Sequence, residues 1–335
     1  WKSNGAVEAS GEIKMNDDVV VSVLCIAYNH EKYIRSALDG FVNQKTDFRY
    51  EVLINDDAST DHTAAIIAEY EAKYPDIIKP VYQTENQYSK GVFITKSILF
   101  PRSKGKYTAI CEGDDYWCDE NKLQKQVDFL ESHEEYAACV HNTRLVDCRT
   151  GGSWPMYKGD QDRDLTFKEV VNYSAACFHT SSILCRREWF CIPDELRANG
   201  FGDYPRAVYM RLNGKIHYLK DIMSVYRMFT AGSWTDRNQN NVSKQQRICG
   251  QKAITDFTEK LRRYCREQGI APEYQKAVND VANRDRLQLA ALQKGGRCLL
   301  HGPQLGIFMG LSLEKKIQVL GTVWTEFKTE RNEKR

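Results

Sequence analysis

Ala109-Ile110-Cys111-Glu112-Gly113-Asp114-Asp115-Tyr116-Trp117 is the stretch from which the fold of this chain is best inferred. It runs from a short apolar segment directly into two adjacent carboxylates and then into two aromatic residues. Adjacent carboxylates repel each other, and each raises the pKa of the other unless a cation lies between them. Because Gly-Asp-Asp is also good turn chemistry, the stretch alone leaves a turn and a metal site open.

The residues before this stretch alternate between strand-like and helix-like patterns. The expected elements are, in order, strand 19–27, helix 33–42, strand 51–55, a helix capped by Ser59 or Thr60, strand 77–82, helix 91–100 and strand 107–111. The first strand is a nearly unbroken β-branched run, which is typical of a strand buried on both faces. Strands alternating with helices at this spacing predict βαβ units, and therefore an α/β fold with a mostly parallel, Rossmann-like sheet.

Unusual polar residues follow three of these strands: Tyr28-Asn29, Asp56-Asp57 and Asp114-Asp115. In open α/β sheets, ligands bind at the carboxyl ends of the strands. The sequence therefore favours a nucleotide site over a simple turn. No glycine-rich phosphate loop follows the first strand and no P-loop motif is present, so a bound diphosphate would need another positive partner. A divalent cation held by carboxylates would serve.

Three motifs together resemble the family 2 glycosyltransferases, which have the GT-A fold. They are Val21-Ser22-Val23 through Tyr28-Asn29, then Asp56-Asp57-Ala58-Ser59-Thr60-Asp61, then Glu112-Gly113-Asp114-Asp115-Tyr116-Trp117. The order and spacing of the motifs over about a hundred residues carry the resemblance, which covers residues 19–235. It implies an inverting transferase of the kind that builds bacterial surface polysaccharides.

The resemblance also implies roles for individual residues. Tyr28 would stack near the nucleotide base, Asp57 would bond the base at uracil N3, and Asp114 would lie near the ribose. Asp115 would ligate Mg²⁺ or Mn²⁺ on the diphosphate; it is the firm ligand, because the element is Gly-Asp-Asp instead of a strict D-x-D. The remaining residues expected to bind the nucleotide-sugar are Ala27, Asn29, Glu31, Asp56, Arg227 and Trp234. An ordinary strand-end role for Tyr28 and a structural role for Arg227 remain open.

Past the metal motif, the resemblance points to Gly202-Asp203-Tyr204-Pro205, where family 2 enzymes place a catalytic base. Asp203 opens a predicted helix, so it could equally serve as an N-cap, and Gly202 stands where the family motif carries a glutamate. His179 could face an acceptor sugar or be a structural polar residue. In the same region we expect a helix at 122–133, strands at 137–146, 180–185, 215–219 and 222–229, and a loop at 151–164.

The C-terminal third changes character. Helices are expected at 246–267, 272–293 and 313–328, and no catalytic motif occurs there. We expect residues 1–18 to be a disordered leader or expression remnant, 19–240 a catalytic domain and 241–335 a helical extension. Within the catalytic domain, 19–118 would bind the nucleotide-sugar and 119–240 would face the acceptor. The apolar segment 305–324 could pack back onto the catalytic domain or support peripheral membrane association.

Composition limits the alternatives. A net charge of +2 offers no electrostatic case for nucleic acid as a partner. The eleven cysteines show no zinc-type spacing and indicate a reducing compartment, so a cytoplasmic location is expected. We expect sugar transfer from a nucleotide-diphosphate sugar, first of all a UDP-sugar, to a hydroxyl of a glycan or lipid-linked glycan. A non-catalytic sugar-nucleotide-binding or scaffold protein and a nucleotidyltransferase remain the alternatives.

Overall fold

Strand β1 (Val19–Ala27) lies at the centre of the parallel part of a sheet and is buried on both of its faces. The computed structural model describes residues 18–173, 177–198, 200–233, 235–236 and 242–333, so the leader expected at 1–18 falls almost wholly outside the described residues. Side chains of β1 alternate between two cores: Val21, Val23 and Cys25 belong to one and Leu24 to the other. This two-sided burial explains the unbroken apolar run.

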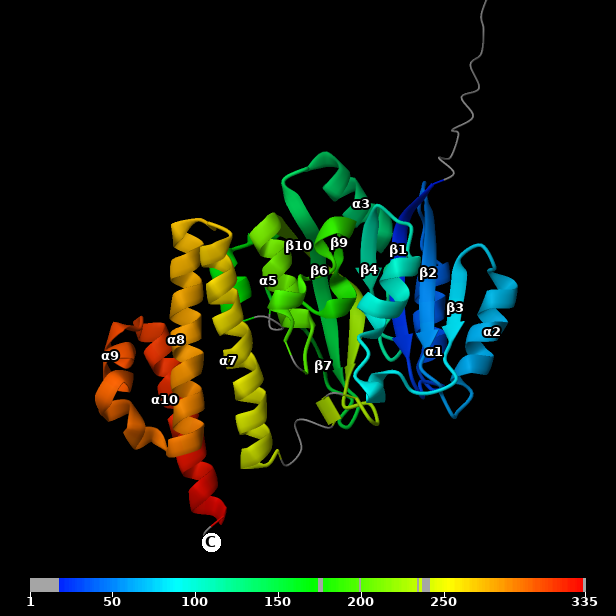
Figure 1. Cartoon of the computed structure of the whole chain (residues 1–335). Helices are drawn as coiled ribbons and strands as arrows, with labels where there is room; N and C mark the ends of the chain where they lie inside the picture. The colour runs from blue at the N-terminus through cyan, green and yellow to red at the C-terminus, as the bar shows by residue number, and fades with distance from the viewer. Residues whose placement is uncertain (1–17, 174–176, 199, 234, 237–241, 334–335) are drawn as a thin grey trace, which may run out of the picture.

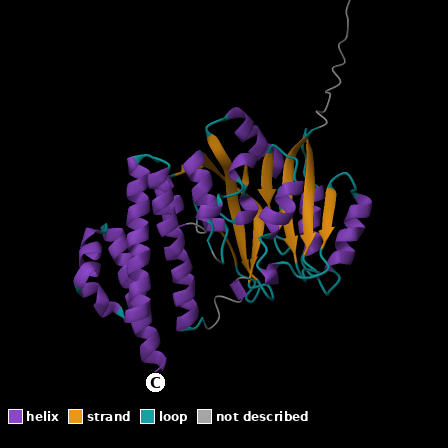
Figure 2. Cartoon of the chain, viewed as in Figure 1, coloured by secondary structure: helices purple, strands orange, loops and turns teal. Residues whose placement is uncertain are grey.

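In the described part of the chain the sheet has ten strands, with a main order of β3-β2-β1-β4-β9-β6-β10-β5 (Figure 2). The other strands are β2 (Arg49–Asp56), β3 (Ile78–Tyr82), β4 (Tyr107–Ile110), β5 (Tyr116–Trp117), β6 (Tyr136–Asp147), β7 (Ser153–Pro155), β8 (Arg163–Leu165), β9 (Leu184–Arg186) and β10 (Lys215–Met228). The β1–β2, β1–β4, β2–β3 and β6–β10 pairs are parallel. The predicted α/β fold with a mostly parallel sheet is confirmed.

Helices cover both faces of the sheet, and a helical region stands at one side (Figure 1). The helices are α1 (Ile34–Val42), α2 (Thr63–Lys73), α3 (Lys122–Ser132), α4 (Phe167–Tyr173), α5 (Asp203–Asn213), α7 (Lys244–Glu267), α8 (Pro272–Lys294), α9 (Gly302–Gly310) and α10 (Leu313–Glu333). Residues of α1, α2 and α3 pack in one core, and residues of α4, α5, α7 and α8 pack in the other. The predicted C-terminal helical region is confirmed.

Several local predictions were wrong. The segment 151–164 is not one loop, because β7 pairs with β6 and β8 begins at Arg163. The strand predicted at 180–185 starts as a 3₁₀ turn and becomes β9 only at Leu184. The two strands predicted within 215–229 are one strand, β10, whose register against β6 shifts near Ile222. Neither Ser59 nor Thr60 caps α2: the Thr63 N–H bonds the Asp61 carboxylate at 2.9 Å.

Two helices were not predicted, α4 and α9. Helix α4 is only seven residues long, and α9 contains Pro303 and three glycines, so neither gives a clear helical period. Helix 91–100 was predicted as one element, but its core is a five-residue π-turn (Thr95–Leu99) between short 3₁₀ turns. Among the residues that the structure describes, every helix is too short or too polar to cross a lipid bilayer.

Candidate active site

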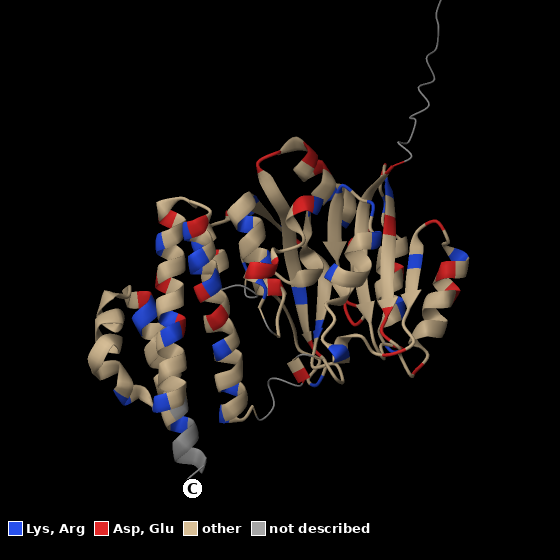
Figure 3. Cartoon of the chain, viewed as in Figure 1, with Lys and Arg blue, Asp and Glu red and all other residues tan. Residues whose placement is uncertain are grey.

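The ends of β1, β2 and β4 meet, as their parallel order requires. The Asp57 N–H donates to the Ala27 carbonyl at 2.9 Å, and the Gly113 N–H donates to the Ile26 carbonyl at 2.9 Å. Asp56, the last residue of β2, pairs in register with Ala27. Figure 3 shows acidic residues along the loops at this lower edge of the sheet, towards which the strand arrows of Figure 2 point.

The loops after β1 and β2 are tied together by polar bonds. Asn29 adopts a left-handed backbone (φ 55°), its N–H donates to Ser59 Oγ at 2.9 Å, and its side-chain oxygen accepts the Thr60 N–H at 2.8 Å. The Glu31 carboxylate lies 2.9 Å from His62 Nδ1. Tyr28 stands beside this lattice with 44% of its surface exposed, so its ring is open to a stacking ligand.

Asp57 and Asp56 are both buried at the end of β2. The two Asp57 carboxylate oxygens accept backbone N–H groups of Gln87 and Tyr88, at 2.8 and 3.0 Å, so Asp57 fixes the loop after β3. Each oxygen keeps a second lone pair, and binding of a base by Asp57 stays a prediction. Asp56 Oδ1 is buried and has no hydrogen-bond partner among the described residues.

Three carboxylates gather after β4 and form what we call the acidic cluster: Glu112, Asp114 and Asp115. One ligand atom from each lies within 4.8 Å of the others. Asp115 Oδ1 accepts the Arg227 N–H at 2.9 Å, whereas its Oδ2 is buried and has no hydrogen-bond partner among the described residues. Asp114 Oδ2 accepts from Thr230 Oγ1 at 3.1 Å. Sequence reasoning did not propose Glu112 as a ligand, although Glu-x-Asp spacing at a strand end was the available signal.

The electrostatics of the acidic cluster call for a cation. Burial, followed by the charges of Asp114 and Glu112, raises the pKa of Asp115 well above its usual value. The Glu112 carboxylate reaches solvent, yet the surrounding protein, Asp114 and Asp203 raise its pKa to about 7, with Arg206 opposing them. Oxygen ligands and an uncompensated negative charge fit a hard divalent cation such as Mg²⁺ or Mn²⁺. The donor set therefore suits the predicted metal.

Asp203 is the first residue of α5 and not its N-cap, which is Gly202. Its carboxylate accepts the N–H of the next residue, Tyr204, at 2.8 Å. Because the charge of Asp203 acts on Glu112, Asp203 lies at the same edge of the sheet as the acidic cluster. Arg206, one turn along α5, feels both carboxylates, and its Nε is buried without a hydrogen-bond partner in the described residues.

Arg227, in β10, touches the acidic cluster with both its backbone and its side chain. Its Nη1 donates to the Asp114 carbonyl at 2.8 Å, and its guanidinium lies 4.4 Å from the centre of the Tyr116 ring. The position next to the cluster fits the predicted donor-side role, and the bonds support the structural role that the sequence left open. Trp234 lies outside the described residues.

His179 also lies against the acidic cluster. Its Nε2 is 3.8 Å from Asp115 Oδ2, its Nδ1 is 2.8 Å from Ser181 Oγ, and its ring stacks on Tyr226 at 4.1 Å. Burial lowers the pKa of His179 to about 3, so the imidazole is neutral. The sequence suggested contact with an acceptor sugar, whereas the structure places this side chain against the predicted metal ligand.

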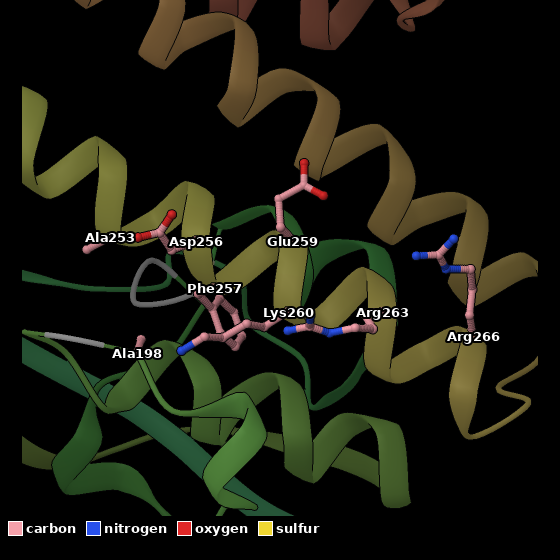
Figure 4. A pocket seen from close by; sticks show the side chains of 8 residues that line it. All are labelled: Ala198, Ala253, Asp256, Phe257, Glu259, Lys260, Arg263 and Arg266. Carbon is pink, nitrogen blue, oxygen red and sulfur yellow. The ribbon is translucent and has the colours of Figure 1, made fainter.

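The largest pocket, about 420 Å³, lies elsewhere. It opens along α7 and is lined by charged side chains that include Asp256, Lys260 and Arg263 (Figure 4). None of the predicted site residues lines it. A smaller pocket of about 40 Å³ includes Gly202 and Arg206 and so borders Asp203. The functional site is therefore defined by the chemistry at the strand ends and not by cavity size.

The sequence model of glycosyl transferase family 2 matches residues 22–191, which span β1, the acidic cluster and β9. This is half of the chain, and the chain therefore belongs to glycosyl transferase family 2. The expected GT-A fold is confirmed by likeness to Staphylococcus aureus TarS 1-349 in complex with UDP-GlcNAc. The TM-score is 0.56 at 20% identity, over 91% of this chain and 79% of that one.

Two relatives place the chain among other sequences of the family. The uncharacterized protein Rv1520 of Mycobacterium tuberculosis (strain ATCC 25618 / H37Rv) is 37% identical over 226 residues, 65% of this chain and 63% of the relative. The match thus spans less than two thirds of that relative. The UDP-Glc:alpha-D-GlcNAc-diphosphoundecaprenol beta-1,3-glucosyltransferase WfaP of Escherichia coli is 31% identical over 117 residues, 35% of this chain and 43% of the relative.

Proposed function

We propose that this chain is an inverting glycosyltransferase that moves a sugar from a UDP-sugar to a hydroxyl group of a glycan or lipid-linked glycan. The observation that carries the proposal is that Asp203 acts electrostatically on Glu112, a member of the acidic cluster. A base and a cation site at one edge of the sheet are the two parts that a single displacement needs. Family membership supports the reaction class.

The acidic cluster would hold Mg²⁺ or Mn²⁺, with Asp115 as the firmest ligand and Glu112 and Asp114 beside it. When bound, the ion would stabilise the negative charge of the departing diphosphate. The chain prepares this site by fixing Asp115 Oδ1 through the Arg227 N–H and leaving Oδ2 without a hydrogen bond among the described residues. His179 Nε2, 3.8 Å from Asp115 Oδ2, limits how that carboxylate can turn.

The donor would lie across the ends of β1 and β2. Tyr28 would stack on the base, Asp57 would accept a hydrogen bond from it, and Asp114 would lie near the ribose. The remaining residues proposed to shape this site are Ala27, Asn29, Glu31, Asp56, Arg227 and Trp234. The names of two relatives, one bound to UDP-GlcNAc and one acting on UDP-Glc, support uridine as the nucleoside.

Asp203 would take the proton of the acceptor hydroxyl as its oxygen attacks the anomeric carbon opposite the leaving diphosphate. Attack from that side inverts the anomeric centre. The first turn of a helix favours an ionised carboxylate, so the position of Asp203 at the start of α5 keeps it able to accept a proton. Arg206 would hold the carboxylates of Asp203 and Glu112 apart by lying between their charges.

The division of the chain follows from these roles. Residues 19–118 would bind the nucleotide-sugar, 119–240 would face the acceptor, and 241–335 would form the helical extension. We propose a cytoplasmic location, supported by the eleven cysteines, all of which are free. Peripheral membrane association would use α9 and the turn before it, where Leu300, Leu305 and Met309 are exposed, because such a surface brings the enzyme to lipid-linked acceptors.

A thermal-shift screen tests the donor and the metal together. We expect UDP with Mn²⁺ to raise the melting temperature, GDP to raise it less, and EDTA to abolish the effect. Incubation with UDP-sugars and a hydroxyl acceptor should then release UDP. Release of pyrophosphate would instead identify a nucleotidyltransferase. Binding of UDP-sugar without any turnover across a panel of acceptors would favour a binding protein.

A further inference from the structure

Helix α10 presents an exposed row of apolar side chains, which we call the α10 stripe. Its members are Leu313, Ile317, Leu320, Trp324 and Phe327, exposed by 75%, 61%, 51%, 58% and 56%. Their spacing of four, three, four and three residues is the a/d repeat of a coiled-coil seam. Exposed rows of large apolar residues are rare on proteins that act alone and usually mark an interaction surface.

The opposite face of α10 is already occupied. Val319 is fully buried beneath α8 and the turn at 296–300, and Lys315 Nζ bonds Asn172 of α4. Gln288 of α8 donates to the Gln318 carbonyl and to Thr322 Oγ1. Figure 1 shows α10 (red) running past the end of α8. The α10 stripe therefore faces away from the rest of the described chain, while the helix that carries it is firmly held.

We propose that the α10 stripe pairs with the same stripe of a second copy of this chain, as an antiparallel two-helix seam about a two-fold axis. In that register Ile317 lies opposite the partner's Phe327, and Leu320 lies opposite the partner's Trp324. Each apolar residue of this core then meets a different residue of the partner, so large and small side chains alternate along the seam.

Charge and backbone agree with the antiparallel register. Glu314 and Lys328 flank the stripe at positions that an antiparallel seam brings together, Glu314 to the partner's Lys328 and the reverse. In a parallel seam the same two charges would stay about 21 Å apart along the axis. Gly321 lies between them near the two-fold axis, and no described atom lies within 4 Å of where a Cβ would stand, so a second helix can approach closely there.

A membrane surface fits the α10 stripe less well. Helices that lie in the lipid interface carry a wide apolar face and a polar face rich in Lys and Arg, whereas a strict a/d row is the narrower seam of a coiled coil. Glu314 and Lys316 lie in the first turn beside the row, so its flanks carry both signs of charge. The proposal does not depend on the reaction proposed above.

Sedimentation velocity over a range of protein concentrations tests the proposal. Two heptads make a short seam, so we expect a dimer of twice 38.6 kDa that dissociates on dilution. Leu320→Glu should sediment as a monomer at every concentration. Met309→Glu is the matched control, because Met309 is equally open, at 63% exposure, but lies on α9; this variant should still form the dimer. Thermal melts check that both variants fold.

Charge reversal tests the register. Glu314→Lys and Lys328→Glu should each weaken the dimer by about three- to tenfold, since each contact occurs twice, and the double variant should restore it. Singles that weaken the dimer without restoration by the double would overturn the antiparallel register. A wild-type chain that stays monomeric would overturn self-association. If that monomer also binds anionic vesicles and Leu320→Glu does not, the stripe serves lipid instead.

Discussion

The backbone N–H of Arg227 donates to Oδ1 of Asp115 at 2.9 Å, joining two residues that lie 112 positions apart in the chain. The bond spans from the middle of the sheet's antiparallel edge to the loop after β4, so β10 fixes the orientation of the predicted metal ligand. The second oxygen of Asp115 is left buried without a hydrogen bond among the described residues. The chain thus tolerates an unfavourable buried carboxylate in a position suited to binding a cation.

Asp115→Asn should separate stability from function. The variant removes one of three repelling charges, so the metal-free protein should melt about 2–4 °C higher than wild type. Transfer activity should fall about 100-fold or more, as with other groups that stabilise charge during reaction. Asp221→Asn, which loses an exposed partner of Lys125, is the control and should change neither. Wild-type activity in Asp115→Asn would remove this residue from the metal site.

Stability without metal should depend on the ionisation of Glu112. The folded protein raises the pKa of Glu112 from 4.5 to about 7, so it holds a proton that the unfolded chain has released. Stability therefore falls as pH rises from about 4.5 to about 7. Urea unfolding of metal-free protein across this range should show the decline, and Glu112→Gln should reduce it. Equal slopes in the two proteins would contradict the clustering of charges.

Asp203→Asn should abolish chemistry while preserving donor binding. Loss of a general base lowers turnover by about 10²–10⁴-fold, whereas the affinity for UDP, measured by calorimetry with Mn²⁺, should stay within experimental error of wild type. Asp194→Asn is a suitable control, because Asp194 is an exposed carboxylate whose ion pair with Lys96 is superficial. Transfer at the wild-type rate by Asp203→Asn would assign the base elsewhere.

Lys122 is a buried cation that should make stability depend on alkaline pH. Its Nζ bonds Gln126 Oε1 at 2.7 Å and lies 4.1 Å from the centre of the Trp117 ring, and burial lowers its pKa from 10.5 to about 7. The unfolded chain therefore binds more protons between these values, and stability rises as pH increases from about 7 towards 10.5. Lys122→Met should lose that rise, measured by thermal melts.

Lys125→Met is the matched control for Lys122→Met. Lys125 lies three residues further along α3, but it forms ion pairs with Asp119 and Asp221 that raise its pKa above 10.5. Its contribution to stability is therefore present below about 10.5 and is lost only at higher pH. The variant should keep the rise between pH 7 and 10. If both variants lose it, another group is responsible.

Some of the structure could be predicted because its signals are local. The β-branched run of β1, the carboxyl-rich strand ends and the long helices α7, α8 and α10 each carry a period or a composition that a short window reveals. Topology follows from βαβ spacing, which brings Ala27 and Asp57 into contact. The acidic residues at the strand ends therefore identified both the fold class and the location of the site.

The rest depended on contacts between distant residues. Glu112 is one glutamate among many in the sequence, and only its place beside Asp114, Asp115 and Asp203 raises its pKa. His179 is a lone histidine until β10 and the 3₁₀ turn bring it to Asp115. Short elements such as α4 and β7 form because neighbours satisfy their backbone groups and bury their side chains, which no local window contains. The sequence by itself determined the layers and the strand ends, and only tertiary packing decided which charges share an environment.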